Sequence, residues 1–371
     1  MHVVMFYHSL LSDWNHGNAH FLRGVVSELT RRGHRVSVYE PRDGWSLENL
    51  VRGHGLDPVE AFHRAYPGLT SHFHDPRHFD ADALLHDADL VLVHEWNSPE
   101  LVRLIGEHRR DHGGYRLLFH DTHHRVVSDR EAMARHHLEH YDGVLAFGEV
   151  IRRIYLDAGW SERAWTWHEA ADPQVFHPLP GIAPERDLVW IGNWGDDERT
   201  QELHEFLLEP ARELALSGSV HGVRYPDAAR AAVDAAGLDY RGWIANFDVP
   251  RAFSRHRVTV HVPRRPYVRM LPGIPTIRPF EAMACGIPLI SAPWRDDDHL
   301  FEAGRDYLTA DDGAAMRRQL RAVLNDRDMA AELARHGRET ILARHTCAHR
   351  VDQLLDIVQQ LRPASLREAI A

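Results

Sequence analysis

The chain has 371 residues, which favours two domains, and its 44% hydrophobic and 26% charged residues are typical of an ordinary globular protein. Its formal net charge of −11, without a strongly basic block, argues against extended binding to nucleic acid. All 43 basic residues are Arg, which excludes a lysine-dependent phosphate loop, a Schiff-base enzyme and pyridoxal chemistry.

The cysteines, the apolar runs and the histidines indicate where the protein is located and whether it binds a metal. The two cysteines give no disulfide framework, no run of about 20 apolar residues predicts a membrane span, and the first residues lack both a basic leader and a small-residue cleavage site. We therefore predict a cytoplasmic protein. The 30 His residues are scattered without a ligand spacing such as HExxH, so we expect no metal site.

The N-terminal half alternates short apolar runs with helical patterns. Residues 3–7 predict a strand, residues 19–32 a helix ended by Gly33, and residues 36–39 the next strand. Further strands are expected at residues 88–94, 115–120 and 143–147, with a helix at 98–110. Such runs predict a parallel sheet covered on both faces. The poorly patterned stretch 47–80 is interpreted as an irregular insertion.

A second alternating series follows a Pro- and Gly-rich stretch at residues 176–184, which predicts a linker. We expect strands at 188–191, 219–221, near Tyr240, 258–262 and 287–291, and helices at 199–216, 226–236, 313–325 and 327–344. The fold class is thus α/β, with two Rossmann-like doubly wound domains that face each other across a cleft. The predicted parts are an N-terminal domain 1–177, a linker 178–186, a second domain 187–345 and a C-terminal helix 346–371 that can pack back on the first domain.

The stretch TIRPFEAMACGIPLIS, residues 276–291, carries the strongest chemical signal. Pro279 suits the first position of a short helix, and Gly286 suits a left-handed position after its end. The helix start offers unpaired N–H groups and a positive dipole to a phosphate. Glu281 can accept two hydrogen bonds from the vicinal hydroxyls of a ribose. The alternative is that Glu281 only complements the dipole of its own helix.

Within this stretch, PFEAMACGIPLISA resembles the GT-B glycosyltransferases, particularly the large retaining group called family 4. The Arg-x-Phe-Glu form at residues 278–281 is most similar to the CgeB-like branch. Three further segments resemble the family in order: NHGNAHFLRGVVSELTRRGHRVSVYE, DGVLAFGEVIRRIYLDAGW and EAADPQVFHP. The resemblance implies two Rossmann-like domains and a nucleoside-diphosphate sugar as donor, with Glu281 as the ribose ligand.

The resemblance also implies the remaining donor residues. Arg199 takes the second place of the family's diphosphate pair, Asn193 stands at the first, and Arg278 or Arg224 can supply the missing charge. Where the family often has a Glu on the donor sugar this chain has Gly273, which leaves the backbone N–H groups of Ile274 to Thr276, with Pro275 between them. Gly17 lets its loop approach the diphosphate closely. Alternatively, Arg199 is a solvated residue at a helix start.

On the first domain, Phe119-His120-Asp121-Thr122 lies at the carboxyl end of a predicted strand and resembles the family's His-Asp pair near the reacting sugar. His120 and Asp121 are therefore the predicted catalytic residues. His120 can hydrogen-bond the donor sugar, and Asp121 can orient that sugar or contact the acceptor. The competing interpretation is a core His satisfied by the backbone.

These observations predict a retaining, hexosyltransferase-like glycosyltransferase that uses a nucleoside-diphosphate sugar, most simply a UDP-sugar, and transfers to a hydroxyl of a small molecule or glycan. The resemblance implies a front-face displacement without a metal or other cofactor. The expected partners are the nucleotide sugar and an acceptor, with no nucleic acid. Two alternatives stay open: a nucleotide-sugar epimerase or hydrolase, and a non-catalytic nucleotide-sugar-binding protein.

Overall fold

The computed structural model describes residues 1–361, which fold into two compact units. Of the described residues, unit 1 contains 1–12, 22–168 and 347–361, and unit 2 contains 13–21 and 169–346. The units therefore meet along the chain at residues 168 and 169, earlier than the predicted boundary at 177. The loop of residues 13–21 groups with unit 2, although the sequence placed it in the first domain. Residues 362–371 of the predicted C-terminal helix lie outside the described residues.

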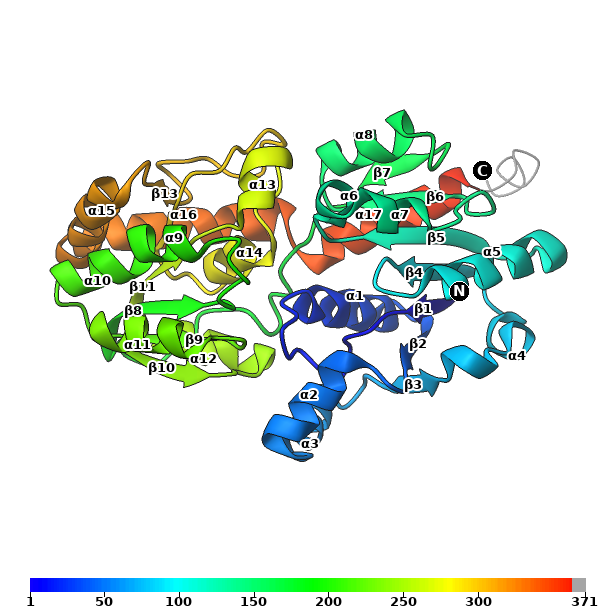
Figure 1. Ribbon diagram of the computed structural model, residues 1–371, viewed down its shortest axis with the longest axis horizontal. Coiled ribbons are helices and arrows are strands. Elements are labelled where there is room, and N and C mark those ends of the chain that lie inside the picture. Colours follow the sequence, from blue (N-terminus) through cyan, green and yellow to red (C-terminus); the bar gives the residue numbers. More distant parts are fainter. Residues whose placement is uncertain (362–371) are drawn as a thin grey trace. The chain divides into compact units, whose positions relative to one another are not determined.

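Unit 1 is built on a seven-stranded parallel sheet with the order β3-β2-β1-β4-β5-β6-β7 (Figure 1). Its strands are β1 (His2–Phe6), β2 (Arg35–Pro41), β3 (Ser71–His74), β4 (Leu90–His94), β5 (Arg116–Asp121), β6 (Gly143–Ala146) and β7 (Ala164–Thr166). Its helices are α1 (Ala19–Arg31), α2 (Trp45–His54), α3 (Asp57–Ala65), η1 (Pro76–His78), α4 (Ala81–Leu85), α5 (Pro99–His112), α6 (Arg125–Ser128), α7 (Arg130–Ala134), α8 (Glu149–Asp157) and α17 (Cys347–Gln360).

The expected irregular insertion at residues 47–80 is wrong. This stretch holds most of α2, all of α3 and the edge strand β3. The two helices are short, and each buries one large apolar side chain, Leu50 in α2 and Phe62 in α3. The edge strand has the sequence Ser-His-Phe-His, and of its four side chains only that of His74 is buried, so it lacks the apolar run that marks the inner strands.

Helix α17 groups with unit 1 and is held there by two backbone contacts of Arg350. Its guanidinium donates to the carbonyl of His168 (2.8 Å), while its own carbonyl accepts from the indole N–H of Trp167 (2.8 Å). Arg350 is buried, and burial lowers its pKa to about 10. The guanidinium therefore stays charged at neutral pH. It provides a hydrogen-bond donor for the carbonyl of His168, the last residue of unit 1 before the chain enters unit 2.

Unit 2 is built on a six-stranded parallel sheet with the order β10-β9-β8-β11-β12-β13 (Figure 1). The strands are β8 (Arg186–Ile191), β9 (Gly218–His221), β10 (Leu238–Gly242), β11 (His256–His261), β12 (Leu289–Ser291) and β13 (Leu308–Thr309). The helices are α9 (Thr200–Leu203), η2 (His204–Leu208), α10 (Glu209–Glu213), α11 (Asp227–Ala235), η3 (Asn246–Asp248), α12 (Val249–Ser254), α13 (Arg265–Met270), α14 (Ile277–Ala284), α15 (Gly313–Asn325) and α16 (Arg327–Arg344).

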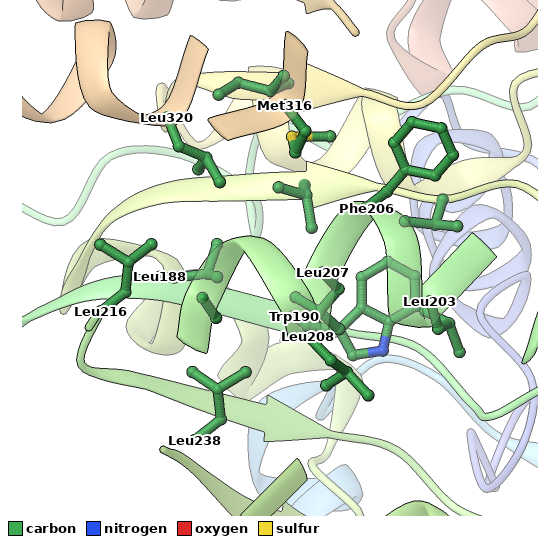
Figure 2. Close-up of a cluster of buried hydrophobic side chains, with 14 of the residues drawn as sticks. Leu188, Trp190, Leu203, Phe206, Leu207, Leu208, Leu216, Leu238, Met316 and Leu320 are labelled. Atoms are coloured by element: carbon green, nitrogen blue, oxygen red, sulfur yellow. The ribbon is translucent and has the colours of Figure 1, made fainter. Parts of the chain in front are cut away.

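Strand β8 shows how this sheet buries both faces. Leu188 and Trp190 enter one core cluster with side chains of η2 and α15, which Figure 2 shows at close range. Val189 and Ile191 point the other way, into a second cluster with side chains of α12 and α14. The predicted pair of doubly wound parallel sheets is therefore confirmed for both units.

Helix α14 carries the TIRPFEAMACGIPLIS motif but begins two residues before its predicted start. Ile277 is the first helical residue, after Thr276 at a positive φ of 62°. Pro279 is thus the third residue, not the first. It still costs no hydrogen bond, because the first four N–H groups of a helix lack internal partners. Gly286 follows the helix at φ 66°, as predicted.

Two features of residues 1–361 as a whole concern membrane-spanning helices and the two cysteines. No helix within residues 1–361 is long and apolar enough to cross a membrane; the cytoplasmic location stays a prediction. Both cysteines are buried free thiols, Cys285 in unit 2 and Cys347 in unit 1. Burial raises the pKa of the Cys285 thiol well above its ordinary value.

Candidate functional site

A small pocket in unit 2 is lined by three of the predicted donor residues, Gly17, Asn193 and Arg278. It lies where β8 and β9 end, beside the start of α14, and its volume is about 60 Å³. The carboxyl ends of parallel strands are the usual ligand edge of such a sheet. Its lining residues are Asp13, Asn15, His16, Gly17, Ile191, Gly192, Asn193, His221, Gly222, Val223, Trp243, Ile244, Asn246, Val249 and Arg278.

Glycines allow close approaches at two places around this pocket. A Cβ on Gly222, whose φ is 154°, would lie 2.1 Å from the carbonyl oxygen of Gly192. A Cβ on Gly17 would lie 2.8 Å from the Ile277 side chain and 3.9 Å from the guanidinium of Arg278. The glycine at position 17 thus lets this loop lie close to the first side chains of α14. Its predicted approach to a diphosphate stays a prediction.

Glu281 lies next to this pocket and is fully buried. Its Oε1 accepts from Nδ1 of His20 (3.0 Å) and from the side-chain amide of Asn246 (3.3 Å). Its Oε2 accepts from the guanidinium of Arg278, one turn earlier on the same helix. Three donors from three segments therefore converge on one carboxylate, which is more than complementing its own helix dipole requires.

His20 has a defined proton position in this network. The backbone N–H of Asp172 donates to Nε2 of His20 (2.8 Å), so Nε2 carries no hydrogen. The proton must then sit on Nδ1, from which it is donated to Glu281. The ring also stacks on Phe176 at a centroid distance of 3.8 Å and an angle of 12°. His20 is therefore a neutral donor held in one orientation by its neighbours.

The two predicted diphosphate residues after β8 serve the loop itself in this structure. The amide of Asn193 donates to the Asn15 side chain (2.7 Å), and its oxygen accepts from the N–H of Val223 (2.9 Å). Arg199 donates to the carbonyls of Asn193, Trp194 and Val262 and lies over the Trp190 ring. Burial lowers the pKa of Arg199 to about 9, which still leaves it charged at neutral pH.

The other predicted donor residues are divided. Arg278 lines the pocket, whereas Arg224 does not and instead pairs with Asp196 (2.7 Å) on the surface of unit 2. Gly273, Ile274, Pro275 and Thr276 precede α14 and are also absent from the pocket lining. Gly273 has a φ of 92°, and a Cβ there would lie 2.6 Å from the carboxylate of Asp298. A carboxylate therefore stands beside the position where the family's Glu is missing.

Glu169 adds a second buried acid to this part of unit 2. It is 2% exposed, and burial together with the nearby charge of Glu281 raises its pKa to about 8. The charge of Arg278 opposes this shift but does not outweigh it. Glu169 is therefore mainly protonated at neutral pH, so Arg278 neutralises one carboxylate, not two.

In unit 1, the predicted His120 and Asp121 are both buried at the carboxyl end of β5. Nδ1 of His120 lies 2.6 Å from the Tyr7 hydroxyl, and burial lowers the His120 pKa to about 3. Asp121 accepts from the backbone N–H of His123 (3.0 Å) and from the Tyr155 hydroxyl (2.8 Å). Burial raises its pKa to about 6. His120 is thus a neutral group at neutral pH, and Asp121 is firmly oriented.

The neighbouring strand β4 ends in a third acidic group. Glu95 is fully buried and pairs with Arg125, whose guanidinium lies 4.2 Å from the centre of the Trp96 ring. Burial raises the Glu95 pKa to about 8, and the charge of Asp121 adds to the shift. One guanidinium therefore faces two carboxyl groups, and Glu95 holds its proton at neutral pH.

Sequence reasoning missed several of these residues. Nothing in the sequence links His20 to Glu281, which is 261 positions away. Asp13, which accepts from the Trp243 indole (3.0 Å) and from the N–H of Asn246 (2.8 Å), gave no signal either. Glu95 could have been found, because His-Glu-Trp follows one apolar run as His-Asp-Thr follows the next. Adjacent parallel strands place such residues side by side.

Comparisons with known proteins give one family model and several solved structures. Residues 199–356 match a family model described as "Glycosyl transferase-like". No curated protein sequence matches the chain. The matched segment contains Arg199, Gly273, Arg278 and Glu281, so most of the candidate donor residues after β8 lie within it.

Several solved structures share the fold across nearly the whole chain. Sucrose-phosphate synthase from Thermosynechococcus elongatus has 16% sequence identity and a TM-score of 0.67, with 97% of this chain and 98% of that chain covered. HepE from Anabaena, in complex with UDP and glucose, has 13% identity and a TM-score of 0.68, with 97% and 100% covered. An alpha-glucosyltransferase in complex with UDP has 12% identity and a TM-score of 0.70, with 97% and 100% covered. The chain therefore has the GT-B fold of glycosyltransferases, as predicted.

Proposed function

We propose that this protein is a retaining, hexosyltransferase-like glycosyltransferase that uses a UDP-sugar as donor. The carrying observation is the convergence of His20, Asn246 and Arg278 on Glu281 beside a glycine-walled pocket. The family model over residues 199–356 supports sugar transfer, and two of the similar structures named above contain UDP. Membership of the CgeB-like branch is part of this proposal and rests on the Arg-x-Phe-Glu form alone.

The contacts of Glu281 suggest how one site serves both ribose and diphosphate. In this proposal Arg278 turns from Oε2 of Glu281 to the diphosphate, which carries more negative charge than one carboxylate. Oε2 then accepts from the ribose hydroxyls while His20 keeps Oε1 in place. Gly17, Asn193 and Arg199 shape the loops around the diphosphate, and Arg199 adds positive charge to the field there.

The pocket must enlarge before a nucleotide can enter. Its volume of about 60 Å³ is far below the several hundred Å³ of ordinary ligand pockets. The loop of residues 13–18 fills it, and that loop is anchored by Asp13 to Trp243 and Asn246 and by Asn15 to Asn193. We therefore propose that this loop moves away when the donor binds.

Asp298 is our candidate for the contact with the donor sugar. Its carboxylate occupies the space beside Gly273, where a side chain would collide with it. A carboxylate oxygen accepts hydrogen bonds from sugar hydroxyls, and the backbone N–H groups of Ile274 and Thr276 precede the helix close by in sequence. Asp298→Asn should raise the KM for the UDP-sugar and leave the affinity for UDP unchanged. Equal losses for both ligands would contradict this role.

The proposed reaction is a front-face displacement at the anomeric carbon. The acceptor oxygen forms its bond to this carbon on the face from which the diphosphate oxygen leaves, and the hydroxyl proton passes to the leaving phosphate. The protein contributes positioning and charge stabilisation, without a metal or other cofactor in the transfer step. In this proposal unit 1 contributes neutral His120 to the sugar hydroxyls and Asp121 to the acceptor side.

A thermal-shift screen of UDP, GDP, ADP and TDP and their sugars tests the donor, because a ligand that binds only the native state raises the unfolding temperature. We expect UDP and one UDP-sugar to give the largest rise. Release of UDP from that donor, measured with and without an acceptor panel of sugars and glycans, then tests the reaction. Release that requires an acceptor supports transfer, and an α-linked product from an α-linked donor supports retention.

The same assays separate the alternatives. Release or epimerisation of the nucleotide sugar without any acceptor would establish the epimerase or hydrolase. Tight binding with no turnover across the acceptor panel would favour a binding protein. No shift with any nucleotide would overturn the assignment of the pocket itself.

A further inference from the structure

Unit 1 carries a cluster of ligand-type side chains on helices α4 and α5. The cluster consists of Asp82, His108 and His112, and one ligand atom of each lies within 4.8 Å of the others. Oδ1 of Asp82 is 3.1 Å from Nε2 of His108 and 3.6 Å from Nε2 of His112. Helix α4 packs on α5, so two segments that are 26 residues apart share this patch (Figure 1).

The separations fit a coordinated ion. Around a tetrahedral Zn²⁺ with bonds of about 2.0–2.2 Å, neighbouring ligand atoms lie roughly 3.4 Å apart. The observed 3.1 and 3.6 Å bracket this value. The two imidazoles come from positions i and i+4 of one helix, and their rings stack at 4.5 Å with an angle of 18°. Both Nε2 atoms lie near the same carboxylate oxygen, Oδ1 of Asp82.

A buried hydroxyl orients the first of these rings. Nδ1 of His108 lies 2.9 Å from the hydroxyl of Tyr115, a residue that is only 2% exposed. A metal-binding His typically has its second ring nitrogen fixed in this way, which sets both ring orientation and tautomer. The His108 side chain is 9% exposed, whereas those of Asp82 and His112 are 77% and 58% exposed. The patch is thus anchored on one side and open to solvent on the other.

We propose that Asp82, His108 and His112 bind one divalent transition-metal ion, best represented by Zn²⁺. Two imidazoles and one carboxylate suit Zn²⁺ and its neighbours better than Mg²⁺ or Ca²⁺, and the open side leaves a fourth position for water. This site was not expected from the sequence, because the third ligand to His-x-x-x-His at 108–112 comes from another helix.

The position of the site indicates a structural role. Helix α4 precedes β4 and α5 precedes β5, so the cluster lies toward the amino ends of these strands. His120 and Asp121 lie at the opposite, carboxyl end of β5. The ion would tie α4 to α5 and raise the stability of unit 1, without taking part in the proposed sugar transfer.

Calorimetric titration of Zn²⁺ into the full-length, chelator-treated protein tests this proposal. We expect one tight site per chain, and at least a tenfold loss of affinity in Asp82→Asn and in His112→Ala. The matched control is His78→Ala. His78 also pairs with an exposed carboxylate, that of Asp75 at 3.0 Å, but it does not belong to the Asp82, His108 and His112 cluster. It should bind Zn²⁺ as the unaltered protein does.

Unfolding temperature gives a second readout. Zn²⁺ should raise it in the unaltered protein and in His78→Ala, but not in His112→Ala, and Mg²⁺ should raise it in none. Because Asp82 and His112 are exposed, these variants are expected to fold. Unchanged affinity in both variants, or an equal loss in His78→Ala, would overturn the proposal. Affinity for UDP, measured in parallel, should be the same in every variant, so failure here is distinct from failure of the proposed function.

Discussion

The candidate sites of the two units treat buried carboxyl groups in opposite ways. In unit 2, Glu281 is met by three donors, His20, Asn246 and Arg278. In unit 1, the charge of Arg125 acts on both Glu95 and Asp121. The donors on Asp121 are the neutral His123 N–H and Tyr155 hydroxyl, and burial raises the pKa of both acids. Donors in excess favour an anionic ligand, whereas carboxyl groups in excess favour groups that hold or exchange protons. The proposed function uses this difference: the nucleotide is assigned to unit 2 and neutral hydroxyl groups to unit 1.

The largest expected effect is on the donor side of this contrast. Glu281→Gln keeps the shape of the side chain but cannot accept from all of its donors and the ribose together. We expect the affinity for UDP to fall about 100-fold, or about 2.7 kcal/mol, measured by calorimetry. Glu332→Gln on the exposed face of α16 is the control and should bind normally. Unchanged affinity in Glu281→Gln would remove the carboxylate from the ribose site.

The second largest effect should separate turnover from binding. His120→Ala removes the neutral imidazole from the end of β5, and we expect kcat to fall about 100-fold, with the UDP dissociation constant unchanged. Tyr7→Phe removes only the hydroxyl that lies 2.6 Å from His120 and should lower kcat less. A loss of UDP affinity in His120→Ala would contradict the proposal that unit 2 binds the nucleotide and His120 of unit 1 acts only in turnover.

A moderate effect is expected for the diphosphate. Arg278→Ala should weaken UDP about tenfold more than uridine, because the guanidinium meets phosphate charge. Arg199→Ala should also weaken UDP more than uridine, but by a smaller factor, since Arg199 also donates hydrogen bonds to three backbone carbonyls. Calorimetry with both ligands measures the two ratios. Equal losses for UDP and uridine would assign Arg199 to loop structure alone.

The pH dependence of stability tests the second acid of unit 2. Glu169 has a raised pKa of about 8 in the folded protein, against an ordinary value of 4.5. As the pH rises between these values, the unfolded chain loses this proton while the folded protein keeps it, so the free energy of unfolding falls. Glu169→Gln removes this loss. Denaturant titrations should show a more stable variant at about pH 8.5 and equal stabilities at about pH 4; equal stabilities at both would contradict the raised pKa.

The smallest effect concerns the loop that fills the pocket. Asp13→Ala removes two of the loop's anchors, to Trp243 and to Asn246, and leaves the contact of Asn15 with Asn193. If the closed loop excludes the nucleotide, a larger open fraction should tighten UDP binding severalfold and speed association. Stopped-flow binding measures the rate. Weaker binding in this variant would show instead that Asp13 helps to hold the ligand.

Local patterns predicted the parts of the fold that depend on local physics. Helices 313–325 and 327–344 were expected with the bounds that the structure has, since Asp312 and Asp326 cap their starts with side-chain hydrogen bonds. The stretch 47–80 failed because its helices bury few side chains and its strand lies at a sheet edge. The start of α14 failed because Thr276 adopts a positive φ, which only its surroundings can impose.

The candidate site shows the same limit. Glu281 and Arg278 were found because they share one helix, and their roles came from family resemblance. His20, Asp13 and Asn246 were missed because chain topology brings them to α14 from remote positions. Arg224 was proposed from sequence order, yet it pairs with Asp196 on the surface and lies outside the pocket lining. Sequence patterns identify residues that are close along the chain, and tertiary contacts decide which of them meet.

The two buried cysteines offer a means to follow each half of this molecule separately. Cys347 lies in unit 1 and Cys285 in unit 2, and a thiol reagent can reach either one only when its surroundings open. Labelling rates of single-cysteine variants would therefore report local opening of each unit separately. Because the chain has no other thiol and no lysine, neither signal would have a background from neighbouring side-chain nucleophiles of these kinds. A donor nucleotide should slow the labelling of Cys285. Binding of Zn²⁺ between α4 and α5 should slow the labelling of Cys347.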